Sequence, residues 1–144
     1  MIILLFSSLI IFIDQLSKFI IRNMLLEGES IEIITNILSL KYLKNRGAAF
    51  GILEGQRYFF IIITFLFFIF ILYLYISELK KNKITDIIII FLLGGSISNL
   101  IDRILFTYVT DFIAVYNFPV INFADIFISL GVVLLMYQLI EIEK

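Results

Sequence analysis

The sequence contains neither cysteine nor histidine. Their absence excludes thiol nucleophiles, disulfide exchange, zinc sites built on Cys or His, haem held by histidine and any Ser-His-Asp arrangement. An enzyme made from this chain would have to work with carboxylates, lysine, arginine, hydroxyls or amides. Repeats and low-complexity linkers are also missing and there is a single proline, so residues 1–144 are predicted to form one membrane-embedded domain.

Charged residues are scarce as well. They make up 16% of the chain, whereas hydrophobic residues make up 62%, and the mean hydropathy is +1.11. Soluble proteins contain about 25% charged and about 45–50% apolar residues, so this composition indicates an integral membrane protein. The net charge of -1 gives no indication of nucleic-acid binding.

The longest uncharged stretch, YFFIIITFLFFIFILYLYIS, lies between Arg57 and Glu78. It has about the length that a helix needs to cross roughly 30 Å of hydrocarbon. Three other apolar stretches contain charged residues, and the first of them lacks the basic region and cleavage site of a signal peptide. We therefore expect an all-α membrane protein with four transmembrane helices, at about 2–24, 58–78, 84–105 and 122–142.

The distribution of lysine and arginine predicts the orientation. The connector ELKKNKITD holds Lys80, Lys81 and Lys83, whereas residues 104–121 contain no Lys or Arg. Short basic loops face the cytoplasm. Both termini are then cytoplasmic, and the segment around Asp111 lies at the outer face of the membrane.

A long connector, about residues 25–57, joins the first two predicted helices on the outer side. Leu38, Leu40 and Tyr42 alternate with polar residues, which is typical of a strand. The following NRGAAFGIL, residues 45–53, indicates a turn or a short surface helix. A small extracytoplasmic β-sheet and surface helix are expected if they rest on the helices or on the membrane; a plain linker is the alternative.

The first predicted helix carries Asp14 and Lys18, four residues apart and on one face. A charged group inside a membrane usually faces a partner or a water-filled cavity, because its burial is costly. The pair could simply neutralise itself or reach toward the interface, or it could support a site.

The third predicted helix contains GGSISNLIDR. Gly94 and Ser98 have the spacing of small residues that allow close helix packing. Asn99 and Arg103 share a face near the outer end of the helix, with Asp102 three residues after Asn99. This group could line a site, or it could be a polar cap that ends the helix at the interface.

Two aspartates lie in the apolar, aromatic segment VTDFIAVYNFPVINFADIF. Asp111 follows the third predicted helix, and Pro119 prevents that helix from continuing. Asn122 is a good N-cap for the fourth helix, and Asp125 falls at the position where an acidic side chain reaches back to the cap. Taken alone, Asp125 could therefore be only a helix-start residue.

The reversal of the chain between the third and fourth helices can bring Asp111 and Asp125 together. Two carboxylates in a poorly hydrated place share one proton and titrate as a unit. One can then act as a base toward water while the other donates a proton, which is the chemistry of an aspartic protease.

Two other function classes remain open on these grounds. A small four-helix ion or proton carrier could use Asp14, Lys18, Asp102 and Arg103, since intramembrane acids and bases also mark translocation pathways. A carrier should place such groups near the middle of the membrane, whereas the two aspartates of the pair cluster at one end. The third class is a non-catalytic scaffold in which the charges only cap helices.

Five segments in order resemble the signature motifs of bacterial lipoprotein signal peptidase, signal peptidase II. They are DQLSK, NRGAAFG, GGSISNLIDR, VTDFI and INFAD, which begin at residues 14, 45, 94, 109 and 121. The resemblance implies a multi-pass enzyme of the bacterial inner membrane with its active site at the outer face. It implies an aspartic endopeptidase that removes the signal peptide from prolipoproteins, cutting before a lipobox cysteine that bears a diacylglyceryl group.

The resemblance also implies roles for single residues. Asp111 and Asp125 would be the catalytic dyad. The substrate-binding or supporting residues would be Asn45, Gly47, Asn99, Arg103, Asn122, Asp14 and Lys18. Neither a metal nor a cofactor is implied, and the expected partners of a monomeric enzyme are diacylglyceryl-modified prolipoproteins and membrane lipids.

Overall fold

The computed structural model describes residues 1–47, 52–77, 79 and 81–142. Its four helices are α1 (Ile2–Met24), α2 (Arg57–Ser77), α3 (Lys83–Phe106) and α4 (Phe123–Ile142). Its three strands are β1 (Ser30–Ile34), β2 (Leu38–Asn45) and β3 (Val109–Val115). All four helices are long and apolar enough to cross a membrane, which confirms the predicted fold class.

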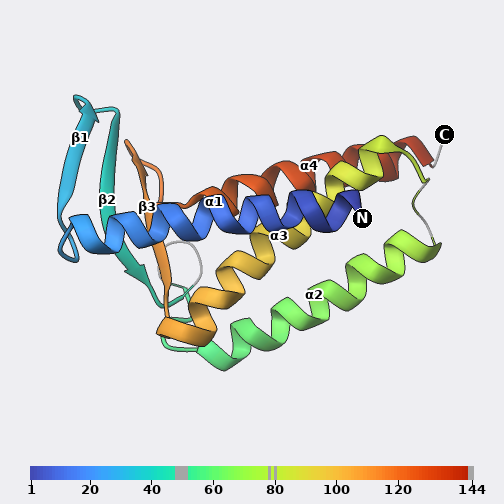
Figure 1. Cartoon of the computed structure of the whole chain (residues 1–144), viewed down its shortest axis with the longest axis horizontal. Helices are drawn as coiled ribbons and strands as arrows, with labels where there is room; N and C mark the ends of the chain where they lie inside the picture. Colours follow the sequence, from blue (N-terminus) through green and yellow to red (C-terminus); the bar gives the residue numbers. More distant parts are fainter. Residues whose placement is uncertain (48–51, 78, 80, 143–144) are drawn as a thin grey trace.

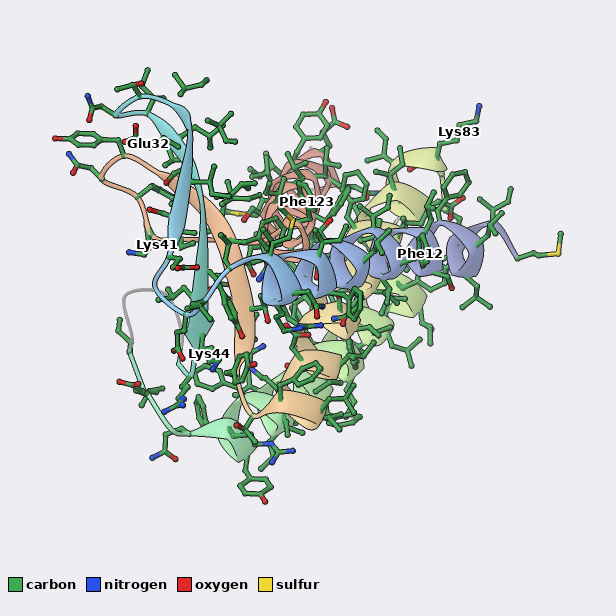
Figure 2. The ribbon with its side chains drawn as sticks, turned by 60° about the vertical axis from the view of Figure 1, so that its left-hand side comes forward. Phe12, Glu32, Lys41, Lys44, Lys83 and Phe123 are labelled. Atoms are coloured by element: carbon green, nitrogen blue, oxygen red, sulfur yellow. The ribbon has the colours of Figure 1, made fainter. Side chains whose placement is uncertain are left out.

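The helices form a bundle with the sheet at one end (Figure 1). Helix α3 packs closely against α1 and α4, whereas α2 packs mainly against α3. The start of α1 and the end of α4 lie at the end of the bundle that is far from the sheet. Figure 2 shows the same division: Glu32, Lys41 and Lys44 lie on the sheet, and Lys83 lies at the opposite end.

The sheet is antiparallel, with β2 between β1 and β3. The alternation at Leu38, Leu40 and Tyr42 predicted β2 correctly, but β3 was not predicted. Strand β3 begins soon after α3 because Thr107 takes a left-handed conformation, with φ at 68°, and turns the chain. Its partner β2 lies more than sixty residues earlier in the chain, so pairing rather than local pattern makes it a strand.

The region expected to hold a turn or surface helix is described only in part, since residues 48–51 lie outside the described residues. Residues 52–55 form a turn that leads into α2. Lys80 of the basic connector also lies outside the described residues, whereas Lys81 and Lys83 are described.

Two glycines of α3 allow the neighbouring helices to approach. A Cβ atom added to Gly94 would lie 2.9 Å from the Cβ of Ile10 in α1. One added to Gly95 would lie 2.6 Å from the backbone oxygen of Ala124 in α4. Small residues at helix contacts in membranes permit this close packing, as the sequence indicated.

A buried ionic cluster lies where α1, α3 and β3 meet. The ammonium of Lys18 lies 2.7 Å from Asp14 and 3.3 Å from Asp102, and all three side chains are fully buried. Asp102 also accepts a hydrogen bond of 2.9 Å from the backbone N–H of Thr110, the second residue of β3. Arg22 lies 3.6 Å from Asp102 and donates to the hydroxyl of Thr110. The cluster therefore fixes the start of β3 against the helices.

We expect Gly95→Ala to destabilise the fold by about 1–3 kcal/mol, because its new methyl group meets a backbone oxygen that cannot move aside freely. Thermal unfolding of the purified protein in detergent measures the effect. Ser8→Ala, an equally small change on the exposed face of α1, is the control. Equal melting temperatures for the two variants would contradict the prediction.

Asp102→Asn should lower the free energy of unfolding by about 3–5 kcal/mol, since it removes one member of a buried ion pair and leaves Lys18 with less compensation. Denaturant unfolding compares it with Glu27→Gln, which breaks the exposed Glu27–Lys44 pair. That exposed pair should contribute at most about 1 kcal/mol. A loss for Asp102→Asn no larger than for Glu27→Gln would disprove the structural role of the cluster.

Candidate active site

A cavity of about 260 Å³ lies between the sheet and the ends of α3 and α4. Six of the residues singled out from the sequence line it: Asn45, Gly47, Asn99, Arg103, Asp111 and Asp125. They come from β2, the turn that follows it, α3, β3 and α4. The structure thus brings residues 45–47 next to residues from the region 99–125, more than fifty positions later in the chain.

Asn122 connects the two aspartates directly. Its side-chain Nδ2 donates to Asp111 at 2.6 Å, and its backbone N–H donates to Asp125 at 3.2 Å. Asn122 itself is fully buried. One residue therefore holds both carboxylates at the same cavity.

Asp111 lies in β3 opposite Leu43 and is 1% exposed. It accepts hydrogen bonds from the amides of Asn122 and Asn45, the latter at 2.8 Å. Burial, together with the charge of Asp125, raises the pKa of Asp111 to about 7, although the two amides oppose the shift. This carboxyl group can therefore carry a proton near neutral pH.

Asp125 occupies the first turn of α4, as predicted. Its backbone N–H donates to the side-chain oxygen of Asn122 at 2.9 Å while its carboxylate accepts from the Asn122 N–H, which is a capping box. The other carboxylate oxygen accepts from Nδ2 of Asn99 at 2.8 Å. Asp125 is thus a helix-start residue and a cavity residue at once, so the two interpretations of it are compatible.

Asp14 and Lys18 form the expected ion pair, but the pair does not serve only to neutralise itself. Asp14 accepts from the backbone N–H of Ala124 at 3.0 Å, which is one of the free donors at the start of α4. Lys18 donates to the side-chain oxygen of Asn99 at 2.8 Å. Both residues lie behind the cavity and hold α4 and Asn99 in position.

Arg103 lines the cavity from α3. Its guanidinium lies 4.9 Å from the ring centroid of Phe60 in α2, and its Nη1 reaches the backbone oxygen of Asn99 at 3.5 Å. The residue is more than a polar cap on the helix, because it presents a cation to the space that the two carboxylates share.

Ser98 and Gln15 were not recognised as part of this network. The hydroxyl of Ser98 donates to Asp14 at 2.6 Å, and the amide of Gln15 donates to Asp102 at 3.0 Å. The sequence indicated only a packing role for Ser98. Their partners lie more than eighty residues away in the chain, so no spacing within one helix could reveal these bonds.

The charges around the cavity balance if the two aspartates share one proton. With Asp111 protonated, the described residues of the cavity and of the buried ionic cluster behind it include three cations and three carboxylates. The cations are Lys18, Arg22 and Arg103, and the carboxylates are Asp14, Asp102 and Asp125. Within the described part of the chain, no group of three or more metal-binding side chains comes together. The arrangement can supply one base and one acid to a molecule in the cavity.

Comparisons with known proteins identify the family of this chain. The sequence profile of the family described as signal peptidase (SPase) II matches residues 6–141. Two solved structures, both described as bacterial membrane enzymes, are each 35% identical to this chain. The first superimposes with a TM-score of 0.90 over 96% of this chain and 87% of its own, and the second with 0.85 over 95% and 91%.

The family match indicates the activity of the chain, and the four apolar helices agree with its location in a membrane. The family consists of aspartic-type peptidases that act on lipoprotein precursors, and four apolar helices are what a multi-pass protein of the bacterial inner membrane requires. The chain belongs to the signal peptidase II family, and it is a membrane-embedded aspartic peptidase that removes signal peptides from lipoprotein precursors.

Proposed function

We propose that Asp111 and Asp125 are the catalytic dyad with which this chain cuts prolipoproteins before the lipidated lipobox cysteine. The observation that carries the proposal is the double hydrogen bond of Asn122, which holds both carboxylates at one cavity. The resemblance of VTDFI and INFAD to the family's motifs, which include these two aspartates, supports the same pair.

The dyad acts on a water molecule with one proton between its two members. The ionised member takes a proton from water as the oxygen attacks the scissile carbonyl, and the protonated member donates to the carbonyl oxygen. Arg103 lines the cavity and can stabilise the negative charge that develops on the tetrahedral species. Asn99 and Asn122 keep the two carboxyl groups oriented.

The substrate is a precursor whose cysteine already bears a diacylglyceryl group. Its acyl chains remain in hydrocarbon beside the exposed apolar faces of the helices, so only the peptide has to enter the polar cavity. Asn45 and Gly47, at the end of β2, lie where an extended peptide would approach the dyad. Membrane lipids surround the remaining apolar surface.

The orientation follows from the basic connector. Lys81 precedes α3 and Lys83 is its first residue. Both lie at the end of the bundle where α1 starts and α4 ends, whereas the sheet lies at the other end. With the basic end in the cytoplasm, the dyad faces the outer side of the inner membrane. We expect residues 1–144 to form a single domain and to act as a monomer.

Asp111→Asn and Asp125→Asn should each lower the rate of signal-peptide removal by on the order of 10² to 10⁴-fold, because each removes a group that transfers a proton. The measurement is cleavage of a diacylglyceryl-modified prolipoprotein by the purified enzyme. The product should be a shortened protein whose new N-terminus is the lipidated cysteine.

Asp86→Asn is the matched control for these variants, because Asp86 lies in the first turn of α3 at the far end of the bundle. It should cleave like the wild type. Circular dichroism verifies that all three variants fold. Full activity of either dyad variant would exclude the assignment.

The pH profile tests the shared proton. Asp111 is protonated below pH 7 and loses its proton as the pH rises through about 7, after which both carboxyl groups are charged. We expect kcat/KM to fall by about tenfold per pH unit above that point. Return to pH 6.5 should restore activity, which separates titration from unfolding. A rate that stays level up to pH 9 would contradict a protonated Asp111.

A further inference from the structure

Lys18 makes one contact more than its ion pairs require. Its side chain is fully buried in α1, and its ammonium reaches Asp14 at 2.7 Å, Asp102 at 3.3 Å and the Asn99 side-chain oxygen at 2.8 Å. An ammonium has three N–H donors and accepts no hydrogen bond. Two of the donors point to the carboxylates of Asp14 and Asp102. The third donates to the neutral amide of Asn99, which faces the cavity.

That third bond determines which way the Asn99 amide points. Since Lys18 can only donate, the atom of Asn99 that faces it must be the oxygen. The NH₂ group, which can only donate, is then directed at Asp125, where it lies 2.8 Å from the carboxylate oxygen. This oxygen of Asp125 must therefore be an acceptor.

The two amides that bond to Asp111 differ from Asn99 in the partner of their oxygen atoms. Asn45 and Asn122 also direct their NH₂ groups at Asp111, but their oxygens accept from the backbone N–H groups of Gly47 and Asp125. Those donors carry no formal charge. Among the three amides that face the dyad, only Asn99 is polarised by a cation, and a bond that involves a charged group is about twice as strong as a neutral one.

The other charges near Asp125 do not cancel the difference between the amide bond to Asp125 and the amide bonds to Asp111. Those that face it from the packed elements are Lys18 and Asp14 of α1, Asp102 and Arg103 of α3, and Asp111 of β3. The carboxylate of Asp14 is already bonded to Ser98, Lys18 and the Ala124 N–H. Asp102 is bonded to Gln15, Lys18 and the Thr110 N–H. Arg103 favours an ionised partner in the cavity.

We propose that Lys18 is a positioning residue that acts through Asn99 to keep Asp125 ionised, so that Asp125 is the general base and Asp111 holds the proton. The inference rests on the proposed function, because it assigns the two roles within the same dyad. The charge of Asp125 in turn favours the protonated form of Asp111, so the two halves of the dyad support one another.

The reaction then has a definite proton path. Asp125 takes a proton from water while the water oxygen bonds to the scissile carbon, and Asp111 gives its proton to the carbonyl oxygen. The tetrahedral species returns that proton to Asp111 as the carbonyl re-forms. Asp125 gives its proton to the leaving nitrogen as the C–N bond breaks. The products are a carboxyl group on the signal peptide and an amino group on the lipidated cysteine, and the dyad regains its single proton.

The test is the pH dependence of kcat/KM for Lys18→Met and Asn99→Leu on a diacylglyceryl-modified prolipoprotein. Both variants lose the polarised amide bond, so the acidic limb of the profile should move up by about one pH unit, a loss that approaches tenfold at pH values below the limb and disappears above it. KM should change less than twofold. Asn99→Leu leaves Lys18 paired with Asp14 and Asp102, so it tests the inference even if Lys18→Met fails to fold.

Asp14→Asn is the matched control. It breaks the same ion pair as Lys18→Met but leaves the cation bonded to Asn99, so its acidic limb should not move to higher pH. If Lys18 were only structural, Lys18→Met would lower the activity at every pH without moving its acidic limb. If the wild type cleaves the substrate but the acidic limb of Asn99→Leu stays at the wild-type pH, this inference alone is wrong. If the wild type does not cleave the substrate, the proposed function is wrong as well.

Discussion

Ionisable groups that are buried between membrane helices need partners, because there is no water in the hydrocarbon to solvate them. In this chain several of these partners come from another element. Asp14 of α1 bonds to the start of α4, and Asp102 of α3 bonds to the start of β3. Lys18 lies between them and bonds to both carboxylates. These bonds hold α1, α3, β3 and α4 together in addition to close helix packing, because lipid tails are as apolar as the helices and the hydrophobic effect alone does not bring membrane helices together.

The same requirement explains why the cavity lies where it does. Helix α4 begins beside Asp14, about ten residues before α1 ends, which corresponds to roughly 15 Å along α1. Strand β3 and the turn after it occupy the space above the start of α4. The two aspartates are therefore recessed beneath the sheet rather than exposed at its rim. Asp14 and Asp102, which a carrier could also have used, are fully buried and each is paired with Lys18.

The sequence was sufficient for the features that depend on local pattern. Hydropathy located the four helices, alternation located β2, and the spacing of Asn122 and Asp125 predicted the capping box. Strand β3 was missed because its seven residues become a strand only by pairing with β2. The links from Ser98 to Asp14 and from Lys18 to Asn99 were missed for the same reason. Each joins residues more than eighty positions apart, and no helical periodicity carries that information.

The bond between Asp14 and Ala124 also has a consequence for how the protein is made. Helix α1 enters the membrane first, and α4, which brings both Asp125 and the Asn122 cap, enters last. Until then the carboxylate of Asp14 lacks its backbone partner, and the proposed catalytic pair is incomplete. Because Asn122 and Asp125 both belong to the last part of the chain, the proposed catalytic pair can form only once the final helix is in place.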